Sequence, residues 1–414
     1  MTTKIDVVDA VCGAGKTTWV FEQMRTQPEK KWLFVSPYLD EAGDGASKGR
    51  IQKELPELNF KSPSSTPSKK EDFLRLAKKG NNIAITHKLF TGFSVDIAHV
   101  LEEQGYHLII DETIDLVTFY EDIHHQDVKF LILAGMIKCT QTGQLTWNDE
   151  QWPNYTGRDV KIKELCQLGC LWLYGDDVLI QRIPPTCMKA CKTVTILTYL
   201  FEASLMHSWM KLNDMNWSYL YPEEMKPSAE IKEILRQKLH FVPRSKYITD
   251  LQRTSQGLRK SGAFNVGWYK DQDVDSLEKV KKSIEVTLKD QMPKGAVFWT
   301  TFKDYENKLA GIGYTRAKKV NGDLRKPFVS KNMRASNEYK DCNNCLYAVN
   351  IYPHGSLDNH LRQFDVHLDK DLYALSEVVQ FIFRGSIREH KDMYVYILSE
   401  RMQTLVEEWL LLDY

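Results

Sequence analysis

The stretch DVVDAVCGAGKTT at residues 6–18 places two glycines, a lysine and two threonines within six consecutive positions. Glycines let backbone N–H groups turn toward an anion, the lysine adds a positive charge, and a threonine hydroxyl can bind a divalent cation. The usual pattern, G-x-x-x-x-G-K-[ST], has glycine where this chain has Ala10, which is a small replacement. We therefore expect a loop that binds nucleotide phosphates through Gly13, Ala14, Gly15, Lys16, Thr17 and Thr18.

A pair of carboxylates, Asp111 and Glu112, ends the apolar run in LIIDET at residues 108–113. A phosphate loop needs such a partner, because one carboxylate can bind Mg²⁺ and a second can polarise the attacking water. We expect Asp111 and Thr17 to hold Mg²⁺ and Glu112 to act on water, so that ATP and Mg²⁺ are the cofactors and Lys16 joins the two acids as a catalytic residue. The alternative is that the two acids begin a helix, as an N-cap and first-turn pair do.

Short apolar segments predict the strands that must position these residues. They cover residues 5–10, 32–37, 82–87, 106–112 and 193–199. Continuous apolar strands separated by helical stretches are typical of a parallel sheet with helices on both faces. The phosphate loop follows the first of these strands and the carboxylates end the fourth, so we expect Asp111 to face the loop.

A second set of strands and helices follows later in the chain. Strands are predicted near the start of 294–309 and in 345–352 and 392–398, and helices in 376–388 and 401–412. Residues 206–293 show no clear early strand and are expected to form an irregular, basic and aromatic entry segment. The sequence thus predicts an α/β protein with two lobes, residues 1–205 and 206–414.

Composition limits the partners. The 414 residues carry 55 Lys and Arg against 55 Asp and Glu, so a nucleic-acid partner would need a local basic surface. No apolar run reaches the ~20 residues that cross a bilayer. The N-terminus also lacks the layout of a signal peptide. We expect a cytoplasmic protein with no membrane partner.

Cysteines recur at helical spacing, as Cys166 with Cys170 and Cys187 with Cys191. A zinc site is one interpretation, and small buried side chains along helix faces are the other. The pair Cys342 and Cys345 is spaced by three.

In their order, these segments resemble the motifs of superfamily 2 helicases and translocases. The phosphate loop resembles motif I, VSPYLDE (35–41) motif Ia, DETI (111–114) motif II and AVFWTTFKDYENKL (296–309) motif IV, while ILTYLFEAS (196–204) takes the place of motif III with Thr198 as its only close match. The resemblance implies two RecA-like lobes with ATP in the cleft between them. It also implies nucleic-acid contacts at Ser36, Pro37, Thr86, His87 and Thr301.

The segment SEVVQFIFRGSIR (376–388) resembles motif VI, Q-x-x-G-R-x-x-R, whose arginines reach the γ-phosphate in such proteins. This chain has Gln380, Arg384 and Arg388, and the second arginine comes one position later than usual. Residues at i, i+4 and i+8 share a helix face. We therefore expect the three side chains to point together and to be catalytic, the alternative being two solvated arginines on a surface helix.

A closer resemblance is to a family of phage- and prophage-encoded helicase-like ATPases of DEAD/DEAH type. The resemblance rests on the segments WTTFKDYENKLAGIGYT, NMRASNEYKD, ALSEVVQFIFRGSIR and SERM and on LTYLF at residues 197–201. Ser336 stands where that family has threonine, and the family pattern has no cysteine at the positions of Cys187 and Cys191. The resemblance implies a role in phage replication or recombination in the host bacterial cytoplasm, with phage replication proteins as partners.

Cations alternate with aromatic residues at 238–247, 258–270 and 325–334, as in single-strand grooves and also on ordinary surfaces. We predict an ATP-dependent helicase or translocase acting on single-stranded or partly duplex nucleic acid, with DNA favoured. The alternatives are a packaging, terminase-like or protein-remodelling ATPase and a nucleotide switch without enzymatic activity.

Overall fold

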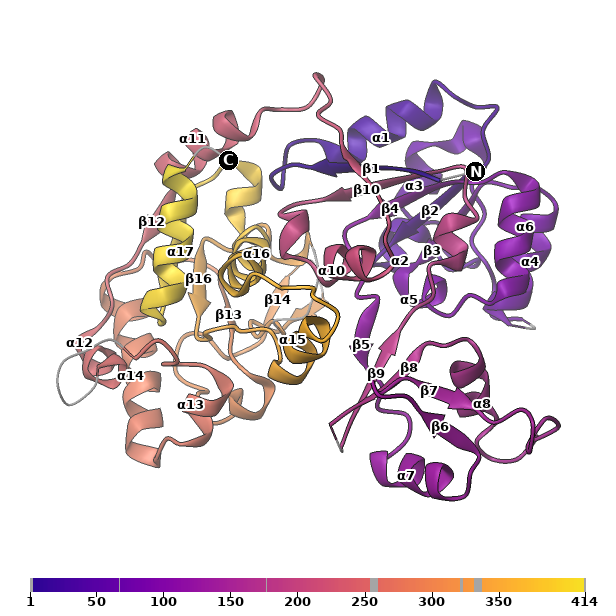
Figure 1. Cartoon of the computed structure of the whole chain (residues 1–414). Coiled ribbons are helices and arrows are strands. Elements are labelled where there is room, and N and C mark those ends of the chain that lie inside the picture. The colour runs from indigo at the N-terminus through magenta and orange to yellow at the C-terminus, as the bar shows by residue number, and fades with distance from the viewer. Residues whose placement is uncertain are drawn as a thin grey trace. The chain divides into compact units, whose positions relative to one another are not determined.

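The computed structural model describes residues 3–66, 68–175, 177–253, 260–320, 323–330 and 337–412. Ser336 and parts of the basic, aromatic stretches 258–270 and 325–334 lie outside these ranges. The chain forms two compact units, whose elements are labelled in Figure 1. Unit 1 comprises Met1–Ala10, Gly15–Met225 and His354–Asp369, and unit 2 comprises Val11–Ala14, Lys226–Pro353 and Lys370–Tyr414. The division into lobes at residue 205 stays a prediction.

Unit 1 is built on a six-stranded sheet in the order β11-β1-β10-β4-β2-β3, with every neighbouring pair parallel. Its strands are β1 (Lys4–Asp9), β2 (Trp32–Ser36), β3 (Ile83–Thr86), β4 (His107–Asp111), β10 (Thr193–Thr198) and β11 (Ser218–Tyr219). The five strands expected from the sequence are present within one or two residues of their expected ends. All five residues of β2 are buried, because helices cover both faces of the sheet.

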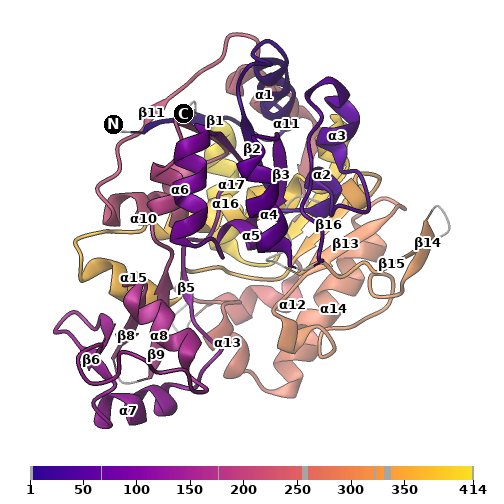
Figure 2. The same cartoon turned by 90° about the vertical axis from the view of Figure 1, so that its right-hand side faces the viewer.

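Side chains of successive strand residues point to opposite faces of this sheet, and each face has its own core. Val8 packs with Phe21 of α1 (Lys16–Arg25) in one core cluster. Val7 belongs to another cluster with Phe73 of α4 (Lys69–Lys78) and Leu101 of α6 (Val95–Gln104). Figure 2 shows α4 and α6 side by side. The helices around the sheet are α1 (Lys16–Arg25), α2 (Leu39–Ala42), α3 (Arg50–Glu54), η1 (Pro56–Leu58), α4 (Lys69–Lys78), α5 (His87–Phe90), α6 (Val95–Gln104), η2 (Phe201–Ala203) and α10 (Leu205–Leu212).

A small subdomain is inserted in unit 1 between β4 and β10. Its elements are β5 (Val117–Phe119), α7 (His125–Leu133), β6 (Ile137–Cys139), β7 (Leu145–Trp147), α8 (Val160–Gln167), β8 (Leu171–Tyr174), β9 (Val178–Arg182) and α9 (Thr186–Lys189). Strands β5, β9 and β8 form an antiparallel sheet, and β6 pairs with β7. A separate core that includes Val128, Leu145 and Ile162 supports it. Helix α15 (Gly355–Arg362) comes from much later in the chain and contacts β9 through Arg182 and His360.

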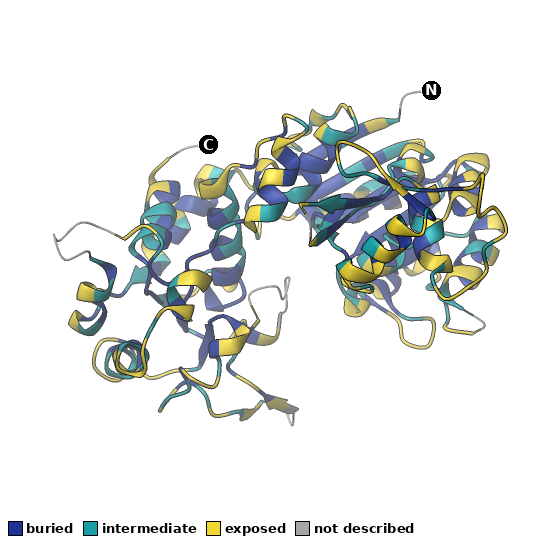
Figure 3. Ribbon diagram, turned by 60° about the horizontal axis from the view of Figure 1, so that its bottom comes forward, coloured by how far each residue is buried: buried dark blue, intermediate teal, exposed yellow. Residues whose placement is uncertain are grey.

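Unit 2 contains a four-stranded parallel sheet in the order β12-β17-β16-β13. Its strands, with the hairpin β14–β15, are β12 (Leu239–Phe241), β13 (Val297–Thr300), β14 (Lys318–Val320), β15 (Asp323–Arg325), β16 (Asn344–Tyr347) and β17 (Met393–Ile397). Its helices are α11 (Ser228–Lys238), α12 (Lys246–Thr249), η3 (Asp250–Gln252), α13 (Val266–Lys270), α14 (Val274–Asp290), η4 (Lys303–Tyr305), η5 (Asn337–Tyr339), α16 (Lys370–Ile382), η6 (Ser386–Glu389) and α17 (Glu400–Leu411). Nearly every residue of β13, β16 and β17 is buried, and buried residues are dark blue in Figure 3.

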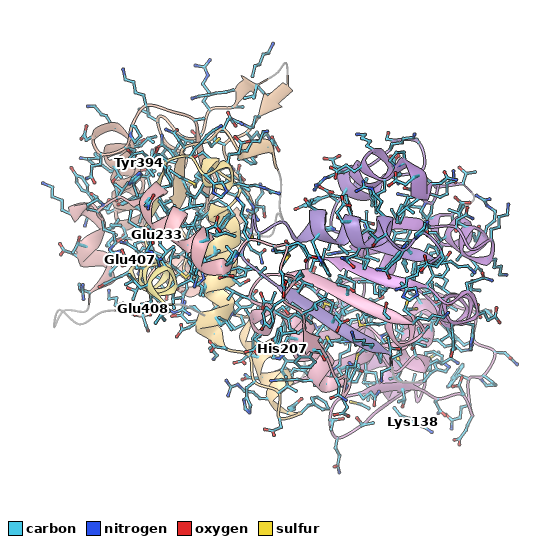
Figure 4. The ribbon with its side chains drawn as sticks, turned by 90° about the horizontal axis from the view of Figure 1, so that it is seen from above. Lys138, His207, Glu233, Tyr394, Glu407 and Glu408 are labelled. Atoms are coloured by element: carbon cyan, nitrogen blue, oxygen red, sulfur yellow. The ribbon has the colours of Figure 1, made fainter. Side chains whose placement is uncertain are left out.

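Helices α11 and α17 of unit 2 are joined at the end of α17, where carbonyl groups lack partners within the helix. Lys232 donates from Nζ to Leu412 O at 2.6 Å, and Arg236 donates to Leu410 O at 2.6 Å. Two cations thus stabilise the negative end of the α17 dipole. Figure 4 labels Glu233 on α11 and Glu407 and Glu408 on α17.

The structure confirms the predicted α/β class with parallel sheets flanked by helices. The placement of an ATP site in a cleft between lobes stays a prediction. Residues 206–293, expected to be irregular, contain the 17-residue helix α14, which begins where Asp273 accepts a hydrogen bond from Ser276 N. Among the described residues, no helix is both long enough and apolar enough to cross a membrane.

Candidate nucleotide site

The phosphate loop lies between the end of β1 and the start of α1. Gly13 and Gly15 have φ values of 88° and 95°, a left-handed conformation that glycine adopts without strain. A Cβ atom at either glycine would meet nothing within 4 Å, so the loop borders open space there. Gly15 is also the N-cap of α1, with no side-chain cap. The first N–H groups of α1 are therefore suited to an anion.

Ala10 is compatible with this loop. Its N–H donates to Thr198 O at 3.0 Å, which extends the pairing of β1 with β10 by one residue. Ala10 is not among the residues with positive φ, so glycine is not needed there. Lys16 is only 8% exposed, and its Nζ donates to the carbonyl oxygen of Ala10 at 2.5 Å. The side chain thus folds back over the loop.

Asp111 is the last residue of β4, and Glu112 follows it with φ of 65°. No helix begins after them, since residues 113–116 have no regular secondary structure and are followed by β5. The helix-start interpretation of the two acids is therefore wrong. Asp111 instead lies at the carboxyl edge of the parallel sheet, the edge at which β1 leads into the phosphate loop.

The electrostatic surroundings of Asp111 connect it to the loop. Its pKa is raised to about 7, first by burial and then by the charge of Glu112. Glu41 raises the pKa as well, whereas the positive charges of Lys16 and Arg50 lower it. A divalent cation would favour the charged form of such a carboxyl. A carboxylate and a threonine hydroxyl are oxygen ligands of the kind that Mg²⁺ prefers, so Asp111 and Thr17 suit that metal by their chemistry.

Glu41 and Arg50 belong to this site although the sequence pattern did not identify them. Arg50 begins α3, pairs with Glu54 at 2.6 Å and with Glu41 at 3.8 Å, and lies 5.6 Å from the ring centre of Phe21. Only the fold of residues 38–50 brings these charges near Asp111. The spacing of Glu41 and Arg50 in the sequence therefore could not predict their place in the site.

Asp9 is a further acid beside the loop. Its two carboxylate oxygens accept the N–H groups of Leu200 and Phe201, each at 2.8 Å. Burial raises its pKa, while these two hydrogen bonds lower it. Asp9 therefore holds the turn after β10 against the strand that precedes the phosphate loop.

Four of the residues predicted to contact nucleic acid lie at the same edge of the sheet. Ser36 ends β2 and Pro37 follows it, Thr86 ends β3, and His87 begins α5. The hydroxyls of Ser36 and of Thr198 on β10 are buried and have no hydrogen-bond partner among the described residues. His87 Nε2 lies 2.9 Å from the carbonyl oxygen of Asp111. Thr301 belongs to unit 2, where it is 1% exposed and its hydroxyl lies 3.5 Å from Ala348 O.

The residues of the motif VI-like segment do not share one helix face. Helix α16 ends at Ile382, after which Ser386 N–H donates to Cys342 O and the chain continues as η6. Gln380 remains in α16, where its Nε2 lies 3.2 Å from Ser376 Oγ. Arg384 is 3% exposed and 5.0 Å from the ring centre of Phe381, whereas Arg388 is exposed. The predicted common face is therefore wrong, and the catalytic role of these residues stays a prediction.

The cysteines are free thiols. Burial raises the pKa of Cys166 to about 12 and that of Cys187 to about 12. In the ranges that the structure describes, no group of three or more His, Cys, Asp and Glu residues is placed to hold a metal.

The fold and the loop define an α/β protein with a phosphate-loop-like turn at the edge of its sheet. Comparisons with known proteins found similar sequences. Residues 244–410 match the model of the "YonV C-terminal Rossmann-like domain", and residues 119–181 match the "YonV middle domain". The second match coincides with the inserted subdomain. The "SPbeta prophage-derived uncharacterized protein YonV" of Bacillus subtilis (strain 168) is 28% identical in an alignment that covers 98% of each protein. This relative agrees with the predicted resemblance to prophage-encoded proteins.

Two solved structures are similar in outline. One, titled "XPD_Helicase", has a TM-score of 0.40 and 11% identity, with 99% of this chain and 90% of that chain covered. The other, "Structure of S. tokodaii Xpd4", has a TM-score of 0.48 and 12% identity, with coverage of 98% and 94%.

Proposed function

We propose that this chain hydrolyses ATP and uses the hydrolysis to move along or remodel a nucleic-acid strand, as a helicase or translocase does. One observation carries the proposal. The phosphate loop with Lys16 and the acid pair Asp111–Glu112 lie at one edge of a parallel sheet, close enough for Lys16 to lower the pKa of Asp111. Such an edge is where open α/β sheets bind ligands.

Each residue of the site has a role in this proposal. The N–H groups of Gly13–Thr18 and the Nζ of Lys16 bind the phosphates, and Thr17 and Asp111 hold Mg²⁺. The bound metal would supply charge stabilisation to the phosphate oxygens. Glu112 orients a water molecule and accepts its proton. The resemblance to motif VI gives Gln380, Arg384 and Arg388 the stabilisation of transition-state charge.

Nucleic acid is the proposed partner for two reasons. The motif resemblance implies nucleic-acid contacts at four residues that share the sheet edge with the loop: Ser36, Pro37, Thr86 and His87. The prophage-derived relative fits a role in phage replication or recombination in a bacterial cytoplasm, with DNA favoured.

A protein-remodelling or packaging ATPase is the second candidate, and one observation favours it. Helix α7 of the inserted subdomain exposes Phe130 (67%) and Leu133 (82%) one turn apart. Exposed apolar pairs of this kind are common where proteins bind each other. Turnover that responds to a protein and to no nucleic acid would favour this candidate.

Lys16→Ala tests the hydrolytic site. We expect turnover to fall about a hundredfold or more, because the loop loses the only side-chain cation among residues 10–18. Steady-state ATP hydrolysis measures the loss, and thermal unfolding checks that the fold persists. Lys88→Ala is a matched control, since Lys88 is an exposed lysine on helix α5 of the same unit. Near wild-type turnover in Lys16→Ala would remove the loop from the mechanism.

A further inference from the structure

The peptide bond between Asp111 and Glu112 is held from both sides. Its N–H, which belongs to Glu112, donates to Leu197 O on β10 at 2.9 Å. Its carbonyl oxygen, which belongs to Asp111, lies 2.9 Å from Nε2 of His87. Because a carbonyl oxygen only accepts, Nε2 must carry the proton. The two poles of one peptide are thus fixed by residues from two different elements.

The strand ladder cannot provide the bond that His87 makes. Pairing of β2 with β4 ends at Val35 and Ile110. It runs in the register where His107 N donates to Lys31 O. Continued in that register, the donor to Asp111 O would be the N–H of residue 37. That residue is Pro37, which has no N–H.

His87 reaches this carbonyl from two strands away. It follows β3, which is separated from β4 by β2, and neighbouring strands lie about 4.8 Å apart. The imidazole therefore crosses the carboxyl end of β2 to replace the donor that Pro37 lacks. This places a side chain of the β3–α5 junction against the backbone of the acid pair.

The backbone conformation of Glu112 makes the hydrogen bond between His87 and Asp111 O important for the direction of both carboxylates. With φ of 65° it adopts a left-handed conformation, which is rare for residues other than glycine and persists where the surroundings enforce it. The plane of the Asp111–Glu112 peptide sets the direction in which each carboxylate leaves the chain. A rotation of that plane would move both side chains.

We propose that His87 is a positioning residue of the hydrolytic site, which orients the Asp111–Glu112 peptide by donating a hydrogen bond from Nε2. This inference rests on the proposed function for its catalytic consequence, but the hydrogen bond and its effect on the backbone are properties of the chain alone. His87 acts through the peptide, and Glu112 and Asp111 remain the groups that would touch water and metal.

Three substitutions of His87 test whether a hydrogen-bond donor at the distance of Nε2 is what matters, rather than another property of the side chain. His87→Gln keeps an N–H donor the same number of bonds from the backbone as Nε2. His87→Asn keeps an amide that is one bond too short, and His87→Leu removes the donor. The matched control is His99→Leu, at an exposed histidine of α6 in the same unit.

The first measurement is backbone hydrogen exchange of residues 108–113 in the nucleotide-free protein, followed by mass spectrometry. Loss of the bond frees one pole of the peptide, so we expect faster exchange at Glu112 N–H in His87→Leu and His87→Asn. His87→Gln and His99→Leu should match the wild type. Equal exchange in all five proteins would overturn the inference whether or not ATP is hydrolysed.

The second measurement is ATP turnover with nucleotide affinity measured separately. We expect His87→Leu and His87→Asn to lose about tenfold or more in kcat, with the Kd for ATP changed less than about twofold, as substitutions of residues that orient catalytic ligands do. His87→Gln should recover kcat to within about threefold. Wild-type protein without turnover would overturn the proposed function, whereas an active wild type with an equally active His87→Leu would overturn the positioning role alone.

Discussion

Glu112 combines an uncommon backbone conformation with the role proposed for it. A left-handed residue other than glycine costs on the order of 1 kcal/mol, and the bonds to Leu197 and His87 on either side of its peptide maintain it. Its side chain leaves the sheet edge beside Asp111, whose pKa its charge raises. A carboxylate placed in this way can accept a proton from water next to a bound phosphate.

Glu112→Gln tests that role without altering the backbone preference. The amide can still hydrogen-bond to water but cannot accept its proton, so we expect ATP to bind normally and turnover to fall about a hundredfold or more. Single-turnover hydrolysis with a separate binding measurement distinguishes the two effects. Glu102→Gln is the matched control, because Glu102 is an exposed glutamate of α6 in the same unit and its loss should cost little turnover. Loss of ATP binding in Glu112→Gln would contradict the assignment.

At the scale of elements, α15 contacts the inserted subdomain through the half-buried Arg182 and the buried His360. The guanidinium of Arg182 lies between the rings of Trp172 and Phe364, with centroid distances of 4.2 and 3.8 Å. Its Nε and Nη2 donate to Nε2 of His360 at 3.0 and 2.8 Å. Since the protonated guanidinium of Arg182 can only donate, Nε2 of His360 must be without a proton to accept these hydrogen bonds, and His360 is therefore neutral. Burial first and the charge of Arg182 second lower the pKa of His360 to about 4.

This neutral histidine predicts acid sensitivity. The folded pKa of about 4 lies below the ordinary value of 6.5, so the unfolded chain binds more protons between these values. The stabilisation is complete above about pH 6.5 and is lost as pH falls toward 4, by an amount on the order of 3 kcal/mol. His360→Gln keeps an acceptor for Arg182 and does not titrate.

The measurement is the free energy of unfolding by denaturant between pH 7 and 4. We expect the curve of His360→Gln to fall less steeply than that of the wild type. His99→Gln, at an exposed position, should leave the slope unchanged. His107 also has a pKa lowered to about 4 by burial, so the slope will not vanish entirely. Equal slopes for His360→Gln and the wild type would contradict the buried neutral state of His360.

The elements that the sequence predicted are those whose burial requires a continuous run of apolar residues. Strands β1, β2, β3, β4 and β10 have long apolar runs because they are covered on both faces. The inserted subdomain escaped prediction, since several of its strands have only three residues and pair antiparallel across tens of residues. Helix α16 ends early because the chain pairs with Cys342 and because Gly385 packs closely. A Cβ there would meet Met393 Cε at 2.8 Å.

The residues of the candidate site likewise divide into those that a local sequence pattern predicts and those that depend on tertiary packing. Lys16, Thr17, Asp111 and Glu112 follow from local pattern, because the loop and the strand end that carry them are continuous in sequence. Glu41 of α2 and Arg50 of α3 reach the site through a connection whose course depends on tertiary packing. Asp9 ends β1 next to the loop, but its bonds to Leu200 and Phe201 depend on the pairing of β1 with β10. His87 was expected at this edge, but its bond to Asp111 depends on Pro37 interrupting a ladder, which requires the strand register.

At the scale of the whole molecule, charge balance makes nucleic-acid binding a question of local surface. The chain has 55 cationic and 55 acidic side chains, so its net charge gives no general attraction to a polyanion. Binding must then come from a limited set of cations that contact backbone phosphates. Each such contact with a single strand releases counterions and contributes about −0.7 to the slope of log K against log salt concentration.

We therefore expect ATP turnover to rise with single-stranded DNA, and affinity for the strand to fall steeply with salt. Four to six phosphate contacts would give a slope of roughly −3 to −4. Fluorescence anisotropy of labelled oligonucleotides at several salt concentrations measures the slope, and turnover with single-stranded DNA, RNA and duplex identifies the substrate. Lys16→Ala serves as the control, because it should still bind the strand while hydrolysing little ATP. Turnover indifferent to every nucleic acid, in a protein that hydrolyses ATP, would leave the catalytic site in place and favour a protein as its target, with the exposed Phe130 and Leu133 of α7 as the first surface to alter.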